Sequence, residues 1–142
     1  MGTQLSVFVE NRPGKLEAIA KALAERKVNI RGISVASAGE YGVVKIIADD
    51  PNLAYELLRK SGFTVSRRSI VIVLIEDLPG SLHKLLETLS GGRVNIEDCY
   101  GIVLEEGKKA AMVLEVEKYP KAERVLQQGG YKVLTDREIH SI

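Results

Sequence analysis

Two short turns of this 142-residue chain combine residue types that could hold the two charged ends of a small molecule. The first is Asn11-Arg12-Pro13-Gly14, and a similar order returns as Asp77-Leu78-Pro79-Gly80. Each turn precedes a predicted helix, whose first N–H groups are unpaired and carry a partial positive charge that suits a carboxylate. Glycine lets a ligand approach the backbone, and Asn11 or Asp77 could accept a hydrogen bond from an ammonium group. Together these groups could bind a free α-amino acid.

The same residues also have a purely structural interpretation. Pro-Gly makes a turn, glycine begins the helix, and the asparagine of Val28-Asn29-Ile30 ends a tight connection from helix to strand. The second copy of that connection is Val94-Asn95-Ile96. Residue types and spacing leave both interpretations open.

Both turns belong to an internal repeat that covers most of the chain. A shift of 66 positions places Glu10–Ile30 on Glu76–Ile96, and eight of the 21 positions are then identical. Average composition would give about one or two identities by chance. We therefore predict two copies of one unit, with residues 1–68 as the first domain and residues 69–142 as the second.

Each copy has the same predicted order of elements. In the first copy, residues 5–9 alternate as a strand does, and apolar residues recur at helical spacing over residues 14–26. Residues 28–38 and 42–48 are rich in β-branched residues and are predicted strands. Asp50-Pro51 begins a second helix, Gly62 ends it, and residues 63–66 form a last strand. The order β-α-β-β-α-β predicts an α+β, ferredoxin-like unit, with two helices on one face of a four-stranded antiparallel sheet.

The second copy has apolar residues on both faces of its first strand. Ile70, Ile72 and Leu74 lie opposite the predicted core set, and we assign Ala110, Met112, Leu114 and Val116 of its third strand to the same opposite face. A sheet that is apolar on both faces must be covered on both. We expect this face to be buried against another sheet, from the first copy or from another chain.

Composition argues against several classes of function. One Cys and two His cannot form a closed Cys/His metal site, and no phosphate-binding P-loop motif is present. A net charge of +1 and an aromatic content of 5% argue against direct nucleic-acid binding. His83 and His140 suggest no catalytic arrangement, and Cys99, beside two acidic residues, is interpreted as a core residue. We predict no catalytic residue, no metal and no cofactor, and hence no enzyme.

The pattern of strand, (Asn/Asp)-x-Pro-Gly, helix and Val-Asn-Ile strand resembles the ACT domain, and the resemblance covers nearly the whole chain as two tandem units. ACT domains are small regulatory modules, commonly for amino acids. The resemblance implies a pocket between paired units, lined by the first turn of one unit and the second strand of a neighbour. The residues so implied are Asn11, Arg12, Pro13, Gly14, Lys15, Leu16, Asn29 and Ile30, with Asp77, Leu78, Pro79, Gly80, Ser81, Leu82, Asn95 and Ile96 in the second copy.

We therefore expect a non-catalytic, amino-acid-binding regulatory protein that forms a homodimer and passes its signal to an enzyme of amino-acid metabolism or to a regulator. Three alternatives remain: an interaction subunit that needs no ligand, a transcriptional co-regulator resembling tandem ACT repressors of glycine-cleavage genes, and an enzyme of ferredoxin-like fold, for which no catalytic set is visible. The longest apolar run, Ile70–Ile75, is too short to cross a bilayer, and no signal peptide is visible. We expect a cytoplasmic protein with no membrane partner.

Overall fold

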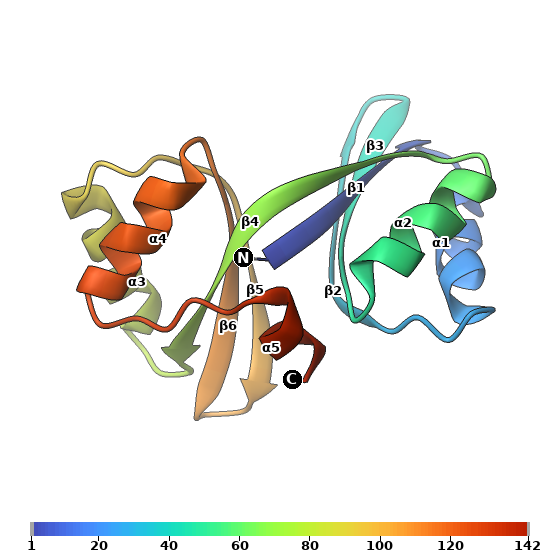
Figure 1. The fold of residues 1–142 in the computed structure, drawn as a ribbon. Helices are drawn as coiled ribbons and strands as arrows, with labels where there is room; N and C mark the ends of the chain where they lie inside the picture. Colours follow the sequence, from blue (N-terminus) through green and yellow to red (C-terminus); the bar gives the residue numbers. More distant parts are fainter. Residues whose placement is uncertain (1, 142) are drawn as a thin grey trace. The chain divides into compact units, whose positions relative to one another are not determined.

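A computed structural model describes residues 2–141 and contains two compact units (Figure 1). The first unit is chiefly Thr3–Arg68 and the second chiefly Ser69–His140. Each unit has a hydrophobic core of its own between its helices and its strands.

In the first unit the elements are β1 (Gly2–Glu10), α1 (Lys15–Ala24), β2 (Ile30–Ala38), β3 (Tyr41–Ala48), α2 (Pro51–Lys60) and the start of β4 (Thr64–Glu76). Strand β3 is antiparallel to both β1 and β2. Helices α1 and α2 lie beside each other on one face of these strands (Figure 1). Leu5 and Val7 of β1 and Val44 of β3 are buried beneath them, because alternate residues of a strand point to the same face.

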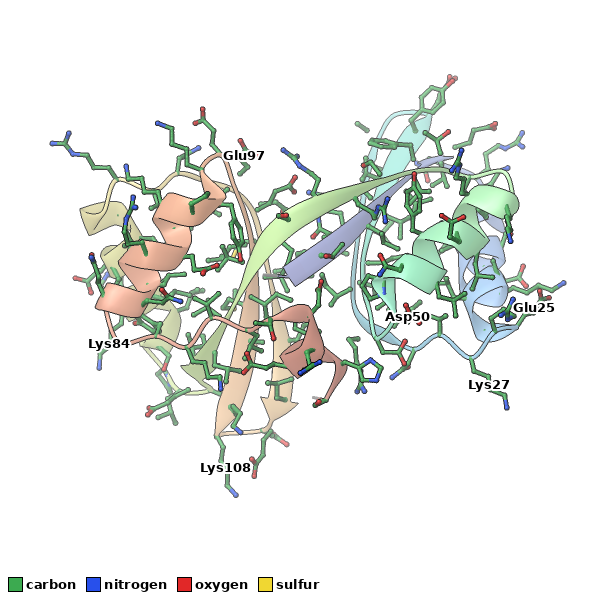
Figure 2. All side chains as sticks on the ribbon, viewed as in Figure 1. Glu25, Lys27, Asp50, Lys84, Glu97 and Lys108 are labelled. Atoms are coloured by element: carbon green, nitrogen blue, oxygen red, sulfur yellow. The ribbon has the colours of Figure 1, made fainter. Side chains whose placement is uncertain are left out.

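The signals at the ends of α2 act as the sequence predicts. Asp50 lies at the start of α2 (Figure 2), and its Oδ1 accepts a hydrogen bond from the N–H of Leu53 at 3.1 Å. Pro51 is the first helical residue, where its missing N–H costs no hydrogen bond. Gly62, two residues beyond the end of α2, has a φ of +88°, the left-handed conformation typical of such positions.

The second unit repeats this order with the rest of β4, α3 (Ser81–Gly91), β5 (Ile96–Glu105), β6 (Lys109–Val116) and α4 (Tyr119–Gln128), and then adds α5 (Asp136–His140). Strand β6 is antiparallel to both β4 and β5. The last strand is reduced to a bridge between Val73 and Val133, flanked by backbone hydrogen bonds. The predicted α+β fold of two tandem ferredoxin-like units is confirmed, with a shorter final strand in the second unit.

Strand β4 is continuous over 13 residues, from Thr64 to Glu76. The sequence predicts a last strand of the first copy that is separate from the first strand of the second, whereas the chain forms both as one strand. Val65 packs against the first core, and Val71 belongs to the second core. A single strand therefore contributes side chains to both cores.

One assignment of strand faces in the second copy is wrong. Ile70 and Ile72 are buried, as expected of an apolar face that is covered. However, Met112, Leu114 and Val116 belong to the core that packs against the helices, and not to the opposite face. The reason is register, since Met112 pairs with Val73 and Leu114 with Val71, and directly opposed residues share a face.

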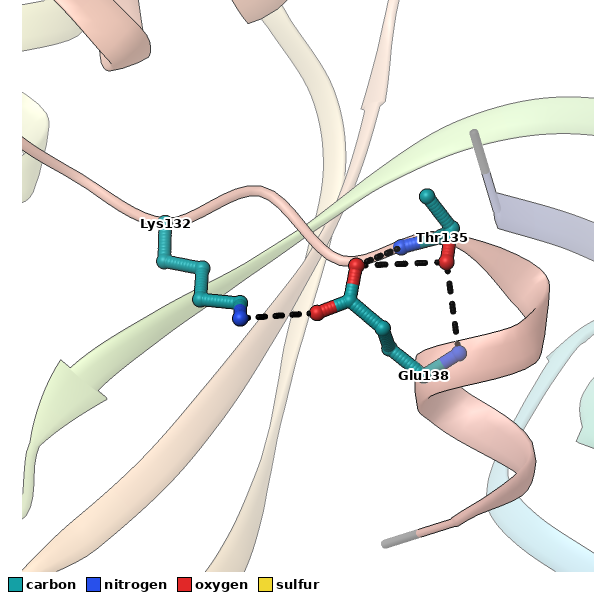
Figure 3. Close-up of polar contacts among 3 residues, drawn as sticks. All are labelled: Lys132, Thr135 and Glu138. Carbon is teal, nitrogen blue, oxygen red and sulfur yellow. Dashed lines mark hydrogen bonds and ion pairs between the residues drawn. The ribbon is translucent and has the colours of Figure 1, made fainter.

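Helix α5 was not predicted. Glu138 Oε1 accepts hydrogen bonds from the N–H and the hydroxyl of Thr135 at 3.3 and 3.2 Å, and the Thr135 hydroxyl accepts one from the N–H of Glu138 at 3.2 Å (Figure 3). This reciprocal arrangement is a capping box, whose signature Thr-x-x-Glu is visible in the sequence at positions 135–138. Ile139 lies on the apolar side of the helix and is buried, with 2% of its surface exposed.

Candidate ligand-binding site

The two turns before α1 and α3 have nearly identical backbones. Gly14 precedes α1 with φ and ψ of 89° and −11°, and Gly80 precedes α3 with 88° and −11°. A positive φ of this size is strained for residues with a side chain, so glycine is required at both positions. In the part of the chain that the structure describes, no side chain caps either helix. The turn and helix start predicted from the repeat are therefore present twice with one geometry.

The space around both glycines is open. A Cβ atom placed on Gly14 or on Gly80 would meet no heavy atom within 4 Å. Gly14 and Gly80 are exposed, and Leu16, Leu78 and Leu82 nearby are each at least 42% exposed. The N–H of Lys15 donates to the Arg12 carbonyl at 3.4 Å and that of Ser81 to the Leu78 carbonyl at 3.1 Å, so the first helical N–H of each turn is engaged. A ligand would use the N–H groups that follow, which lie next to apolar side chains, a combination suited to the carboxylate and side chain of an amino acid.

Asn11 and Asp77 have a structural role that sequence reasoning missed. The Nδ2 of Asn11 donates to the carbonyl of Gly39 at 3.1 Å, and the Oδ2 of Asp77 accepts from the N–H of Gly107 at 2.8 Å. Each side chain thus joins its turn to the next hairpin of the same unit. The Oδ1 atoms of both residues have no hydrogen-bond partner among residues 2–141, so each keeps one acceptor for a ligand.

The charges at the two turns differ, because Leu78 and Ser81 of the second turn stand where the first has Arg12 and Lys15. Arg12 pairs with Glu10, with 3.0 Å between Nε and Oε2, and both side chains are at least half exposed. This ion pair offsets the positive charge of the first turn. Lys15 and Ser81, the first residues of α1 and α3, are half-buried, while Pro13 and Pro79 are exposed.

Within one unit, the predicted strand residues lie at the opposite end of the sheet from the turn. Ile30 pairs with Ala48, whereas Glu10, which precedes the turn, pairs with Tyr41. The separation along β3 is roughly 20 Å or more at the usual rise per residue. A turn and a strand start of the same unit therefore do not form one site.

The strand starts also have structural partners. The N–H of Asn29 donates to Asp49 Oδ1, and the N–H of Asp49 donates to the Asn29 carbonyl, both at 3.0 Å. Ile30 and Ile96 pack against the first and second cores, so only part of each side chain could contact a ligand. Asn29 and Asn95 have exposed side chains.

Cys99 and His83 are both exposed, so interpreting Cys99 as a core residue is wrong. Partial burial and the neighbouring Asp98 raise the pKa of the Cys99 thiol, which disfavours the reactive thiolate. His83 Nδ1 lies 3.2 Å from Glu87 Oε1, one helical turn further along α3. Cys99 was misassigned because β5 is an edge strand, and its alternate residues are exposed.

Residues 2–141 contain no group of three His, Cys, Asp or Glu side chains placed to hold a metal ion. In the same range, no helix is long and apolar enough to span a bilayer.

Comparison with known proteins decides the family. The family described as "ACT domain pair" matches residues 1–142. The chain belongs to this family. The resemblance predicted from the two turns is thereby confirmed, and the fold described above is that of an ACT domain pair.

Solved structures agree with this assignment. Protein BT0572 from Bacteroides thetaiotaomicron is 28% identical, with a TM-score of 0.93 over 99% of this chain and 96% of that one. The ligand-free regulatory subunit of aspartate kinase from Thermus thermophilus is 18% identical, with a TM-score of 0.66 over 89% and 91% of the two chains. The corresponding subunit from Thermus flavus is 19% identical, with a TM-score of 0.60 over 90% and 92%. A search of curated proteins finds no match to this sequence.

Proposed function

We propose that this ACT domain pair is a non-catalytic regulatory protein that binds a free amino acid at the turns before α1 and α3. The observation that carries the proposal is the repeated turn, with a left-handed glycine, open space above it and a helix start that no side chain caps. Membership of a family of regulatory domains supports the same role.

In this proposal the helix start binds the carboxylate and the free Oδ1 of Asn11 or Asp77 accepts from the ammonium group. Because a turn and a strand start of one unit lie at opposite ends of the sheet, the Asn29 or Asn95 region that completes a site must come from another unit, and in our proposal a second copy of the chain supplies it. Binding would then favour a homodimer. An amino acid that binds two states of such a dimer unequally shifts their populations and thereby acts on a partner in amino-acid metabolism.

Calorimetric titration of the protein with each of the common amino acids tests the proposal. We expect at least one to bind, and Gly14→Asp to abolish binding at the first turn, because its carboxylate occupies the space above the helix start. Gly80→Asp is the matched variant, since Gly80 has a φ of +88° and open space, and it should abolish binding at the second turn only. If folded protein binds none of the amino acids, or if Gly14→Asp retains full affinity, this site assignment is wrong.

A ligand-independent regulatory subunit is the second candidate. The observation that favours it is that Arg12 is paired with Glu10 and the Asn11 amide donates to Gly39, so two polar groups of the first turn are already engaged. In this case a partner enzyme or transcriptional regulator binds equally well with and without amino acids. A pull-down at saturating and at zero amino-acid concentration separates the two candidates.

A further inference from the structure

The second unit contains a cleft whose charge has no counterpart in the first. It lies beside the start of α3, has a volume of about 480 Å³, and is lined by residues from four separate segments. The acidic and basic side chains in its lining are Glu76, Lys84, Lys108, Lys109 and Lys132. Figure 2 labels Lys84 on α3 and Lys108 in the β5–β6 hairpin. We call this feature the lysine cleft.

The repeat supplies an internal comparison. The equivalent cleft of the first unit has a volume of about 410 Å³ and includes Gly62 and Phe63, the counterparts of Gly130 and Tyr131 in the lysine cleft. The acidic and basic side chains of the first cleft are Glu10 and Lys15, whereas the lysine cleft has four lysines and one glutamate. Two of the four lysines pair with carboxylates just outside the lining, so the net charge at the lysine cleft is +1.

The difference arises at equivalent positions of the two copies. Tyr41 and Thr64 of the first unit correspond to Lys109 and Lys132 of the second, at an offset of 68. Ala18 corresponds to Lys84 at the offset of 66. The common fold explains the shape of both clefts. It does not explain why Lys84, Lys109 and Lys132 stand in the second unit where the first has uncharged residues.

Lys84 and Lys109 have no ion-pair partner among the residues that the structure describes. The other two are held by carboxylates outside the lining. Lys108 Nζ lies 2.8 Å from Glu105 Oε1, and Lys132 Nζ lies 2.8 Å from Glu138 Oε2. Because these pairs are exposed and such pairs contribute little to stability, an anion in the cleft can compete for both ammonium groups.

We propose that the lysine cleft binds a phosphorylated small molecule. The volume falls within the usual range for small-molecule sites. A phosphate monoester carries about two negative charges at neutral pH and three acceptor oxygens, which suits several ammonium donors arriving from different segments. A carboxylate offers these donors two acceptor oxygens, whereas a phosphate monoester offers three. The proposal does not require that an amino acid binds at the turns.

Titration with inorganic pyrophosphate, without any amino acid, tests the proposal on the full chain. Binding is followed by calorimetry and by backbone amide NMR shifts at low ionic strength. We expect shifts at Ser81–Lys84 and Gly130–Lys132 but not at Lys15 or Gly62–Thr64, and weaker binding as salt is added. No binding, or equal shifts in both units, would overturn the proposal and would leave the amino-acid titrations unaffected.

Lys84→Ala and Lys109→Ala should each lower pyrophosphate affinity about tenfold, the loss typical of one charge-assisted hydrogen bond. Both side chains are exposed, so the variants should fold, and urea unfolding checks this. Lys118→Ala is the matched control because Lys118 is an exposed lysine at the opposite end of the same strands. Equal losses in all three variants would indicate attraction by overall charge only, and tighter binding of citrate than of pyrophosphate would assign the cleft to carboxylates; either result refutes the phosphate assignment.

Discussion

The carboxylate of Asp77 accepts a hydrogen bond from the backbone N–H of Gly107 at 2.8 Å, and this contact joins the turn before α3 to the β5–β6 hairpin. The N–H of Asp77 donates to the carbonyl of Lys108 at 3.2 Å, so the two segments are linked twice. In the first unit Asn11 makes the corresponding link to the β2–β3 hairpin through Gly39 and Glu40. The residue before each Pro-Gly turn therefore fixes the turn relative to a hairpin.

Asp77→Ala should destabilise the protein by about 1 kcal/mol, because the Gly107 N–H loses its acceptor. Asp77→Asn keeps an acceptor oxygen and should lose less. Urea unfolding of both variants measures the difference. If Asp77→Ala unfolds at the same urea concentration as the original chain, the hydrogen bond does not hold the hairpin.

Two adjacent glycines at the end of α3 should respond to alanine in opposite directions. A Cβ on Gly91 meets nothing within 4 Å, whereas a Cβ on Gly92 would lie 2.6 Å from both γ-carbons of Val125 in α4. Gly91→Ala should stabilise by roughly 0.5–1 kcal/mol through lower unfolded-state entropy. Gly92→Ala should destabilise by about 1–3 kcal/mol by overpacking. Thermal unfolding tests the pair, and the same sign for both would contradict the close α3–α4 packing.

Two helices that begin with proline provide a matched test of capping. The Asp50 side chain caps α2, while Lys118 occupies the equivalent position before α4 and makes no side-chain cap. Asp50→Ala should cost about 1 kcal/mol of stability, because the Leu53 N–H loses its acceptor. Lys118→Ala should change the free energy of unfolding by much less. Similar losses in the two variants would mean that the Asp50 cap does not act as described.

Because Glu138 contacts Lys132, the stability of α5 should fall at low pH. The hydrogen bond from Lys132, followed by those from Thr135, holds the pKa of Glu138 below its ordinary value of 4.5. A carboxylate with a lowered folded-state pKa stabilises the fold above its unfolded pKa and loses this effect as pH falls through the folded value. We therefore expect hydrogen exchange in α5 to accelerate only below about pH 4.5, relative to the rate expected for an unstructured chain at each pH.

An NMR titration of the Glu138 carboxylate provides the direct measurement. Lys132→Ala should raise the pKa of Glu138 toward 4.5, while Lys121→Ala, which removes a lysine that donates to the Arg93 carbonyl instead, should leave it unchanged. An unaltered titration in Lys132→Ala would show that the ion pair in Figure 3 does not set this pKa.

The features that could be predicted from the sequence are those with local causes. Pro-Gly turns, the Asp50-Pro51 helix start and alternating apolar strands depend on neighbours within a few residues, and the turns and strands occur in both copies of the repeat. The left-handed glycines at positions 14 and 80 follow from the same local pattern. Even the missed helix α5 has a local signal, in the Thr135–Glu138 capping box.

Only the tertiary structure decided which distant segments meet. Strand register placed Met112 on the helix-covered face of its sheet, and the edge position of β5 left Cys99 exposed. Asn11 and Asp77 were expected to face a ligand alone, yet each is bonded to a hairpin about 30 residues away. The lysine cleft gathers side chains from four segments that no short motif connects. Such contacts depend on chain crossing and pairing over long separations, for which local residue types carry no signal.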